Sequence, residues 1–146
     1  MRRFALAVAT AFSLLACSHP APPVGRWEGV FESNDAMLVA RLEIEADGQV
    51  RASAPNLVDI GAASADDRVA MRAKLAGDLA GGWADVAPHA MDFDGSIFRK
   101  PGGIAPQMEW KAKTKQMWLV VYLGKRPSFR MAMRPVSDFS DDPWNS

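Results

Sequence analysis

Aspartate, histidine and serine side chains could bind a metal ion or form a catalytic triad in this chain, provided that their spacing matches a known motif. Asp92-Phe93-Asp94-Gly95 begins like a calcium-binding loop, but an EF-hand requires a glutamate at its twelfth position, which here is Gly103. The segment is better explained as a turn that leads into a strand. His89 lies outside the N-terminal region, but no Gly-x-Ser-x-Gly motif accompanies it. We therefore predict no enzymatic activity, no metal site and no cofactor.

An export-type segment precedes the sole cysteine of the sequence. Arg2 and Arg3 are followed by an uncharged run over 4–16, which is shorter than the roughly 20 apolar residues of a membrane-spanning helix. At its end, Leu14-Leu15-Ala16-Cys17 resembles the lipobox of bacterial lipoproteins. The resemblance implies that residues 1–16 are a signal peptide, that the Cys17 sulfur receives a diacylglycerol, and that its amine is acylated, for instance with palmitate. Ser18 follows instead of an aspartate, which in that family favours the outer membrane, facing the periplasm.

Charge and cysteine content exclude several classes of protein. The sequence has 17 basic and 17 acidic residues, and removal of Arg2 and Arg3 leaves it slightly acidic. A nucleic-acid-binding protein is therefore not expected. Once Cys17 is lipidated, no thiol remains for a disulfide, a nucleophile or a metal site. The remaining chain, up to Ser146, is long enough for one domain with a core but not for two.

A tether and two strands open the mature chain. Residues 17–24 hold the lipid anchor and three prolines, which favour an extended conformation. Residues 25–32 and 38–45 alternate between two sets of side chains, which is typical of strands, and the second strand has one apolar face.

The register of the next hairpin follows from its turn. A two-residue turn at Asp47-Gly48 would place each apolar residue opposite a charge. A three-residue loop over 46–48, with Gly48 in the left-handed conformation, pairs apolar residues with each other on one face of the hairpin and opposite charges on the other face. The expected pairs are Ile44 with Val50, Leu42 with Ala52, Ala40 with Ala54 and Glu43 with Arg51.

One amphipathic helix is predicted over 65–80. Ser64 is a good N-cap residue, and Gly81-Gly82 is a good stop. Met71, Leu75 and Leu79 form an apolar stripe along the helix. This stripe either covers the sheet or lies on a membrane surface, and its narrow, alanine-rich form favours the sheet.

Four strand patterns follow the helix, over 93–99, 108–113, 117–123 and 129–134. The third is apolar on both faces, which is typical of a central strand or of one that the helix covers. Its inward face depends on whether the turn after Lys113 has two or three residues, which the sequence leaves open. The folded domain thus spans 25–135, and 136–146 is a loosely packed acidic tail. About seven antiparallel strands and one mid-chain helix predict a mainly β domain, built as a small curved sheet or barrel.

A second resemblance concerns the start of the first strand. Gly25-Arg26-Trp27 is similar to the Gly-x-Trp signature of lipocalins and their calycin relatives. In that family the tryptophan closes one end of a barrel, and an arginine on a late strand packs across it. The resemblance implies this role for Trp27, with Arg130 or Arg134 as the arginine. The chain is shorter than the family's members, and its helix lies mid-chain instead of after the last strand.

Large apolar side chains exceed what one packed face requires, and methionines suit adaptable apolar sites. We expect the barrel interior to bind a hydrophobic or amphipathic small molecule or lipid, through Trp27, Trp110, Trp118, Tyr122, Phe129, Met131 and Arg130. The alternative is a protein-interaction lipoprotein, an envelope assembly factor or an inhibitor of a cell-wall enzyme. It would use an exposed edge or the basic hairpins that carry Lys111, Lys113, Lys115, Lys125 and Arg126. An enclosed pocket lined by Trp110 and Met131 favours the first function, and Trp118 and Tyr122 outside a filled core favour the second.

Overall fold

The computed structural model describes residues 20–54 and 57–146. The predicted signal peptide and lipidated Cys17 lie outside the described residues. The elements, in chain order, are β1 (Gly25–Glu32), β2 (Ala36–Ile44), β3 (Gln49–Ser53), β4 (Val58–Asp59), α1 (Ala65–Gly82), the 3-10 turn η1 (Trp83–Asp85), β5 (His89–Ala90), β6 (Asp92–Phe93), β7 (Ile97–Arg99), β8 (Pro106–Lys111), β9 (Gln116–Leu123) and β10 (Arg126–Val136). The fold is mainly β with one mid-chain helix, as predicted.

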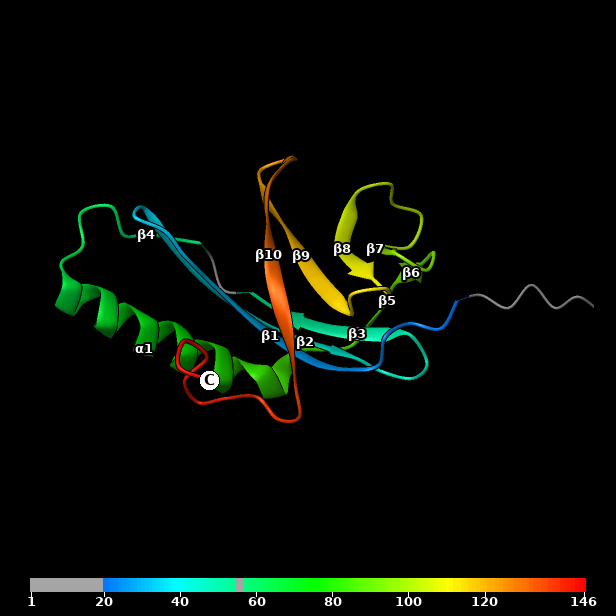
Figure 1. Ribbon diagram of the computed structural model, residues 1–146, viewed down its shortest axis with the longest axis horizontal. Helices are drawn as coiled ribbons and strands as arrows, with labels where there is room; N and C mark the ends of the chain where they lie inside the picture. The colour runs from blue at the N-terminus through cyan, green and yellow to red at the C-terminus, as the bar shows by residue number, and fades with distance from the viewer. Residues whose placement is uncertain (1–19, 55–56) are drawn as a thin grey trace, which may run out of the picture.

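The strands form one antiparallel sheet that is nearly closed into a barrel (Figure 1). The sheet has ten strands in the order β5-β3-β2-β1-β10-β9-β8-β7-β6, with β4 paired to β2 off this path. Its two end strands, β5 and β6, are separated along the chain by Met91 alone. The polypeptide itself therefore links the two edges of the sheet, which explains the near closure without a continuous ladder.

The number of strands is ten rather than about seven, and the difference comes from the shortest ones. β4, β5 and β6 have two residues each. A two-residue strand has no side-chain period, so the sequence pattern cannot indicate it. The predicted strand over 93–99 is also divided, because the turn between β6 and β7 interrupts it.

The register of the β2–β3 hairpin is confirmed. Ile44 opposes Val50, Leu42 opposes Ala52, and Glu43 opposes Arg51. Gly48 has a φ of 84°, the left-handed conformation that the three-residue loop requires. The expected fourth pair does not form, because β3 ends at Ser53, opposite Arg41.

Helix α1 begins as the sequence predicts and ends later. The Ser64 hydroxyl accepts from the backbone N–H of Asp67, and the Asp67 carboxylate accepts from the backbone N–H of Ser64, which completes a capping box. At the other end Gly81 and Gly82 are still helical, and the 3-10 turn η1 follows. Gly82 and Trp83 keep the right-handed helical conformation, so the chain continues into the 3-10 turn η1 instead of changing direction.

The helix covers the outer face of β2, so β2 is buried on both faces. Leu75 and Leu79 pack there with Met37, Val39 and Ile60. The other face of β2 contributes Leu38, Ala40, Leu42 and Ile44 to the barrel interior. The prediction of a single apolar face for this strand is therefore wrong, because Val39 lies under the helix. The prediction that the helical stripe covers the sheet agrees with the structure.

The C-terminal segment is packed, in contrast to the loose tail predicted. Glu28 is fully buried on the outer face of β1, where it binds Arg41 of β2 and Arg134 of β10. Its carboxylate also accepts from the backbone N–H of Ser140, while Arg41 donates to the Ser140 carbonyl at 2.7 Å. β10 runs one residue past Pro135. The buried charges thus hold the tail across the sheet.

Candidate functional site

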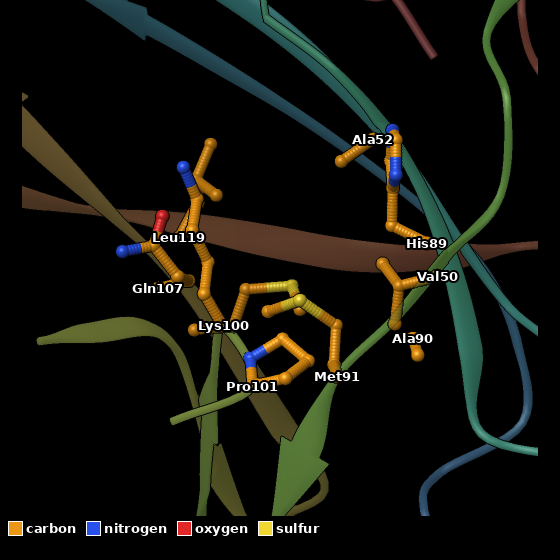
Figure 2. A pocket seen from close by; sticks show the side chains of 10 residues that line it. Val50, Ala52, His89, Ala90, Met91, Lys100, Pro101, Gln107 and Leu119 are labelled. Carbon is orange, nitrogen blue, oxygen red and sulfur yellow. The ribbon is translucent and has the colours of Figure 1, made fainter. Parts of the chain in front are cut away.

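A cavity of about 670 Å³ lies between two walls of the barrel (Figure 2). Strands β3 and β5 form one wall, and the segments around β7, β8 and β9 form the other. Figure 2 shows the two groups of side chains facing each other across the gap, with Met91 and Pro101 near its base. The lining residues are Val50, Ala52, His89, Ala90, Met91, Lys100, Pro101, Gln107, Met108 and Leu119.

The lining of the cavity is apolar except for three side chains. Lys100 and His89 are exposed, and Gln107 is half-buried, so polar groups border the cavity on its solvent side. Val50 and Met108 are buried and belong to the barrel core. A molecule inside would meet hydrocarbon and thioether groups, and a polar end of that molecule would meet the Lys100 ammonium.

A second hollow, of about 440 Å³, adjoins the first at Leu119, which lines both. It lies between the end of β3 and the second half of β9, and its lining is Leu38, Ala54, Leu57, Leu119, Val120, Val121, Tyr122 and Leu123. The two hollows together extend the apolar surface along β9. The arrangement suits an elongated apolar group better than a compact one.

The rest of the interior, along β1 and β10, is filled with side chains. The rings of Trp27 and Trp110 meet edge to face with centroids 6.4 Å apart, and those of Phe31 and Phe129 stack at 4.3 Å. Met131 and Met133 lie beside them in the core. Gly29 leaves the room for these methionines, because a Cβ there would lie 2.5 Å from the Met133 sulfur. This packing fills the interior beside β1 and β10 and leaves the cavity on the side of β3 and β5.

The predicted ligand residues therefore fall into two groups, neither of which lines the larger cavity. Trp27, Trp110, Phe129 and Met131 pack in the filled part of the barrel interior. Trp118, Tyr122 and Arg130 lie on the strand faces that point outward; of these, Tyr122 borders the second hollow. The turn before β9 decides which of these side chains point inward and which point outward. Its loop spans 112–115, so that Met117 opposes Trp110 inside and Trp118 opposes Glu109 outside.

Two of the outward residues, Trp118 and Arg130, line a shallow hollow of about 330 Å³ together with Glu109 and Lys111. Arg130 binds Glu109 with an N···O distance of 2.8 Å, and this hydrogen bond lowers the pKa of the Glu109 carboxyl. The Lys111 ammonium lies 5.6 Å from the centroid of the Trp118 ring. Charges thus flank a half-buried tryptophan on the outside of the sheet.

The lipocalin-like arginine contact does not form. Trp27 points inward, whereas Arg130 and Arg134 alternate with the inward methionines of β10 and point outward. Arg134 binds the buried carboxylate of Glu28 at 3.0 Å. The partner of Trp27 is Trp110 instead.

The comparisons with known proteins give no relative. No protein-family model, curated protein or solved structure matches the chain. The candidate site therefore rests on its own geometry.

Of the two aspartates in the calcium-like segment, Asp94 is used within the turn, and Asp92 accepts from the backbone N–H of Gly102. Asp94 accepts from the backbone N–H groups of Ser96 and Ile97 and binds Arg99 at 2.7 Å. The Arg99 guanidinium and these N–H groups hold the pKa of Asp94 well below its usual range. Over 20–54 and 57–146, no group of three or more His, Cys, Asp or Glu residues is arranged to hold a metal ion. Within the same ranges, no helix is both long and apolar enough to cross a membrane.

Sequence reasoning missed most of the cavity lining. Met91 and Lys100 lie between strands, and Gln107 is near the start of β8, before the predicted strand over 108–113. The sequence singles out His89 only as a possible member of a catalytic triad. The one available signal was the apolar run over 117–123, which supplies Leu119 to both hollows.

Proposed function

We propose that the chain is an envelope-anchored lipoprotein that binds a hydrophobic or amphipathic small molecule or lipid inside its barrel, without catalysis. The observation that carries the proposal is the apolar cavity of about 670 Å³ with Lys100 on its border. Its volume is within the roughly 300–1,000 Å³ of small-molecule sites. The lipobox-like Leu14-Leu15-Ala16-Cys17 supports anchoring at the outer membrane, on the periplasmic side.

The chemistry of the cavity favours an amphiphile with one apolar chain. Each buried methylene contributes about 0.8 kcal/mol on leaving water. The adjoining hollow along β9 gives such a chain more room, from Met108 past Leu119 toward Val121. The exposed Lys100 ammonium suits a carboxylate or phosphate at the head of the molecule.

The test of this function is ligand retention and its loss on blocking the cavity. Native mass spectrometry of the protein purified from its own envelope is expected to detect a bound small molecule of defined mass. A fluorescent fatty acid is then titrated into the wild type and into Ala52→Trp. Ala52 lines the cavity and is exposed, so a large ring can fill the space without displacing the core.

We expect Ala52→Trp to weaken binding of the probe by at least tenfold, because the indole occupies the volume of the chain. The matched control is Ala70→Trp, the same change at an exposed position of α1 outside the cavity, with affinity within twofold of the wild type. Equal affinity in all three proteins, or no probe binding at all, would contradict the proposed function.

The packed positions of Trp110 and Met131 and the outward positions of Trp118 and Tyr122 favour one second candidate, the protein-interaction lipoprotein. Trp118 and Arg130 lie over a shallow hollow with Glu109 and Lys111, and Trp and Arg are residue types enriched at interfaces. Crosslinking from the amine of Lys111, beside the Trp118 ring, in the native envelope tests it. Capture of one defined envelope protein, lost in Trp118→Ala and kept in Ala52→Trp, would support this candidate.

A further inference from the structure

The border of the cavity carries an unusual combination of exposed apolar and basic side chains. Ile104 is 93% exposed and Leu123 is 56% exposed. Lys100, Lys125 and Arg126 are exposed in the same two segments. We call these five residues the basic rim. Lys100 lines the larger cavity and Leu123 lines the second hollow, so the rim is continuous with the candidate binding site.

The two segments of the rim lie at the same end of the barrel. β8 and β9 are antiparallel, so the loop before β8, which carries Ile104, and the turn after β9, which carries Lys125, share one end of that pair. The Tyr122 hydroxyl donates to the carbonyl of Pro106 at 2.7 Å and ties them together. Both segments are at the top of Figure 1.

The opposite end of the same strand pair holds the other lysines. Lys113 and Lys115 are in the turn between β8 and β9. The beginning of the described chain is on that side, because Pro20 lies against Gly95 in the turn between β6 and β7. The basic residues that the sequence brings together are therefore divided between two ends, and the rim combines three of them with Ile104 and Leu123.

One carboxylate offsets part of the charge of the rim: the Asp92 side chain accepts from the backbone N–H of Gly102, between Lys100 and Ile104. The sequence has no acidic residue between Asp94 and Glu109 and none between Glu109 and Asp138. These three carboxylates are already bound to arginines, at 2.7, 2.8 and 2.8 Å for Asp94, Glu109 and Asp138 respectively. With three cations and one nearby carboxylate, the rim keeps an excess of positive charge around apolar side chains.

We propose that the basic rim docks on an anionic phospholipid surface. Exposed cations are attracted to anionic head groups, and exposed aliphatic side chains enter the boundary with the acyl chains. This contact is separate from the lipid anchor, which is expected on the side of the tether. The inference deepens the proposed function and rests on it in one respect: the docked surface would supply the amphiphile to the cavity whose border it contacts.

The experiment measures partition of residues 20–146 onto vesicles. This part of the chain contains every described core residue and is therefore expected to fold without the anchor. The vesicles are phosphatidylcholine alone or with one third phosphatidylglycerol, at low and high salt. We expect binding only to the anionic vesicles, and weaker binding at high salt because of screening.

Two pairs of substitutions distinguish the effect of charge on the rim from the effect of charge elsewhere on the protein. Each cation near an anionic leaflet contributes roughly fivefold to the partition coefficient, so Lys125→Gln with Arg126→Gln should lower it about 25-fold. Ile104→Ser should lower it several-fold with no change in charge. The matched control, Lys113→Gln with Lys115→Gln, removes two lysines from the far turn and should change partition less than twofold.

Three outcomes would overturn the proposal: no binding to anionic vesicles, equal loss in the two pairs, or rim-dependent binding to polyglutamate without vesicle binding, which would assign the rim to an acidic protein. Titration of the fluorescent fatty acid without vesicles keeps this test distinct from the proposed function. The rim variants are expected to bind that probe like the wild type, because Ile104, Lys125 and Arg126 do not line either hollow.

Discussion

Replacement of the buried Glu28 carboxylate should cost this protein a large part of its stability. Glu28 has no exposed surface, and its oxygens accept from Arg41 at 3.4 Å, from Arg134 at 3.0 Å and from the Ser140 N–H at 3.2 Å. Glu28→Gln keeps the shape of the side chain but removes its charge and places an amide NH₂ against these donors. The Arg41 guanidinium, 5% exposed, would then be buried without a counter-charge.

The expected loss is about 3 kcal/mol in the free energy of unfolding. Breaking a buried ion pair by removing one partner costs roughly 3–5 kcal/mol. The lower value applies here because Arg41 keeps two other contacts, the Ser140 carbonyl at 2.7 Å and the Phe139 ring at 4.9 Å from its guanidinium carbon. Arg134 is partly exposed, so water can reach it.

Urea denaturation of residues 20–146, followed by tryptophan fluorescence, measures this loss. The double variant Glu28→Gln with Arg41→Met should be more stable than the sum of the single changes predicts, by at least about 1 kcal/mol, since it leaves no unpaired charge at Arg41. Glu109→Gln is the matched control at an ion pair on the surface, with unfolding close to the wild type. Additive single changes, or a loss at Glu28 no greater than at Glu109, would refute the reasoning.

Three further changes test separate parts of the fold by the same denaturation assay. Ser64→Ala removes the cap of α1 and should cost about 1 kcal/mol, whereas Ser64→Asp should restore most of it. Gly29→Ala places a Cβ 2.8 Å from the Ala132 carbonyl and should cost about 1–3 kcal/mol; unchanged stability would show that β1 and β10 can separate there. Glu32 binds Arg72 through both oxygens, and this lowers the pKa of Glu32 from its ordinary value of 4.5. The pair therefore stabilises the fold fully above that value and loses its effect as the pH falls through the lowered pKa. Glu32→Gln should consequently show a weaker decrease in the urea midpoint between neutral and acidic pH, and an identical decrease would contradict the assignment.

Local patterns predicted the parts of the fold that local geometry controls. The register around Gly48 follows from the need to keep Ile44 and Val50 on one face, and the structure has that pair. Ser64 predicts the start of α1 because only its side chain and that of Asp67 are needed to complete the cap. In both cases the decisive contacts join residues close together in the sequence.

The candidate site was predicted poorly, because its lining comes from contacts across the barrel. The aromatic surplus suggested a pocket, but Trp27 and Trp110 fill part of the barrel interior instead. The cavity forms where β3 and β5 face Lys100 and Leu119, segments that have no local relation in the sequence. Chain length and hydrophobicity alone do not indicate which part of a barrel interior is filled by side chains and which part is a cavity.

The sequence by itself determined a mainly β domain with one helix, a lipobox-like start, and the absence of any recognisable catalytic motif. Tertiary structure alone decided which face of β9 is inward, because the loop over 112–115 sets that orientation. It also joined Glu28 to the C-terminal segment, a contact over 112 positions of the chain. The physical reason is the same in each case. The alternation of side chains along a strand indicates which residues share a face, but the closure of the sheet decides which other residues that face contacts.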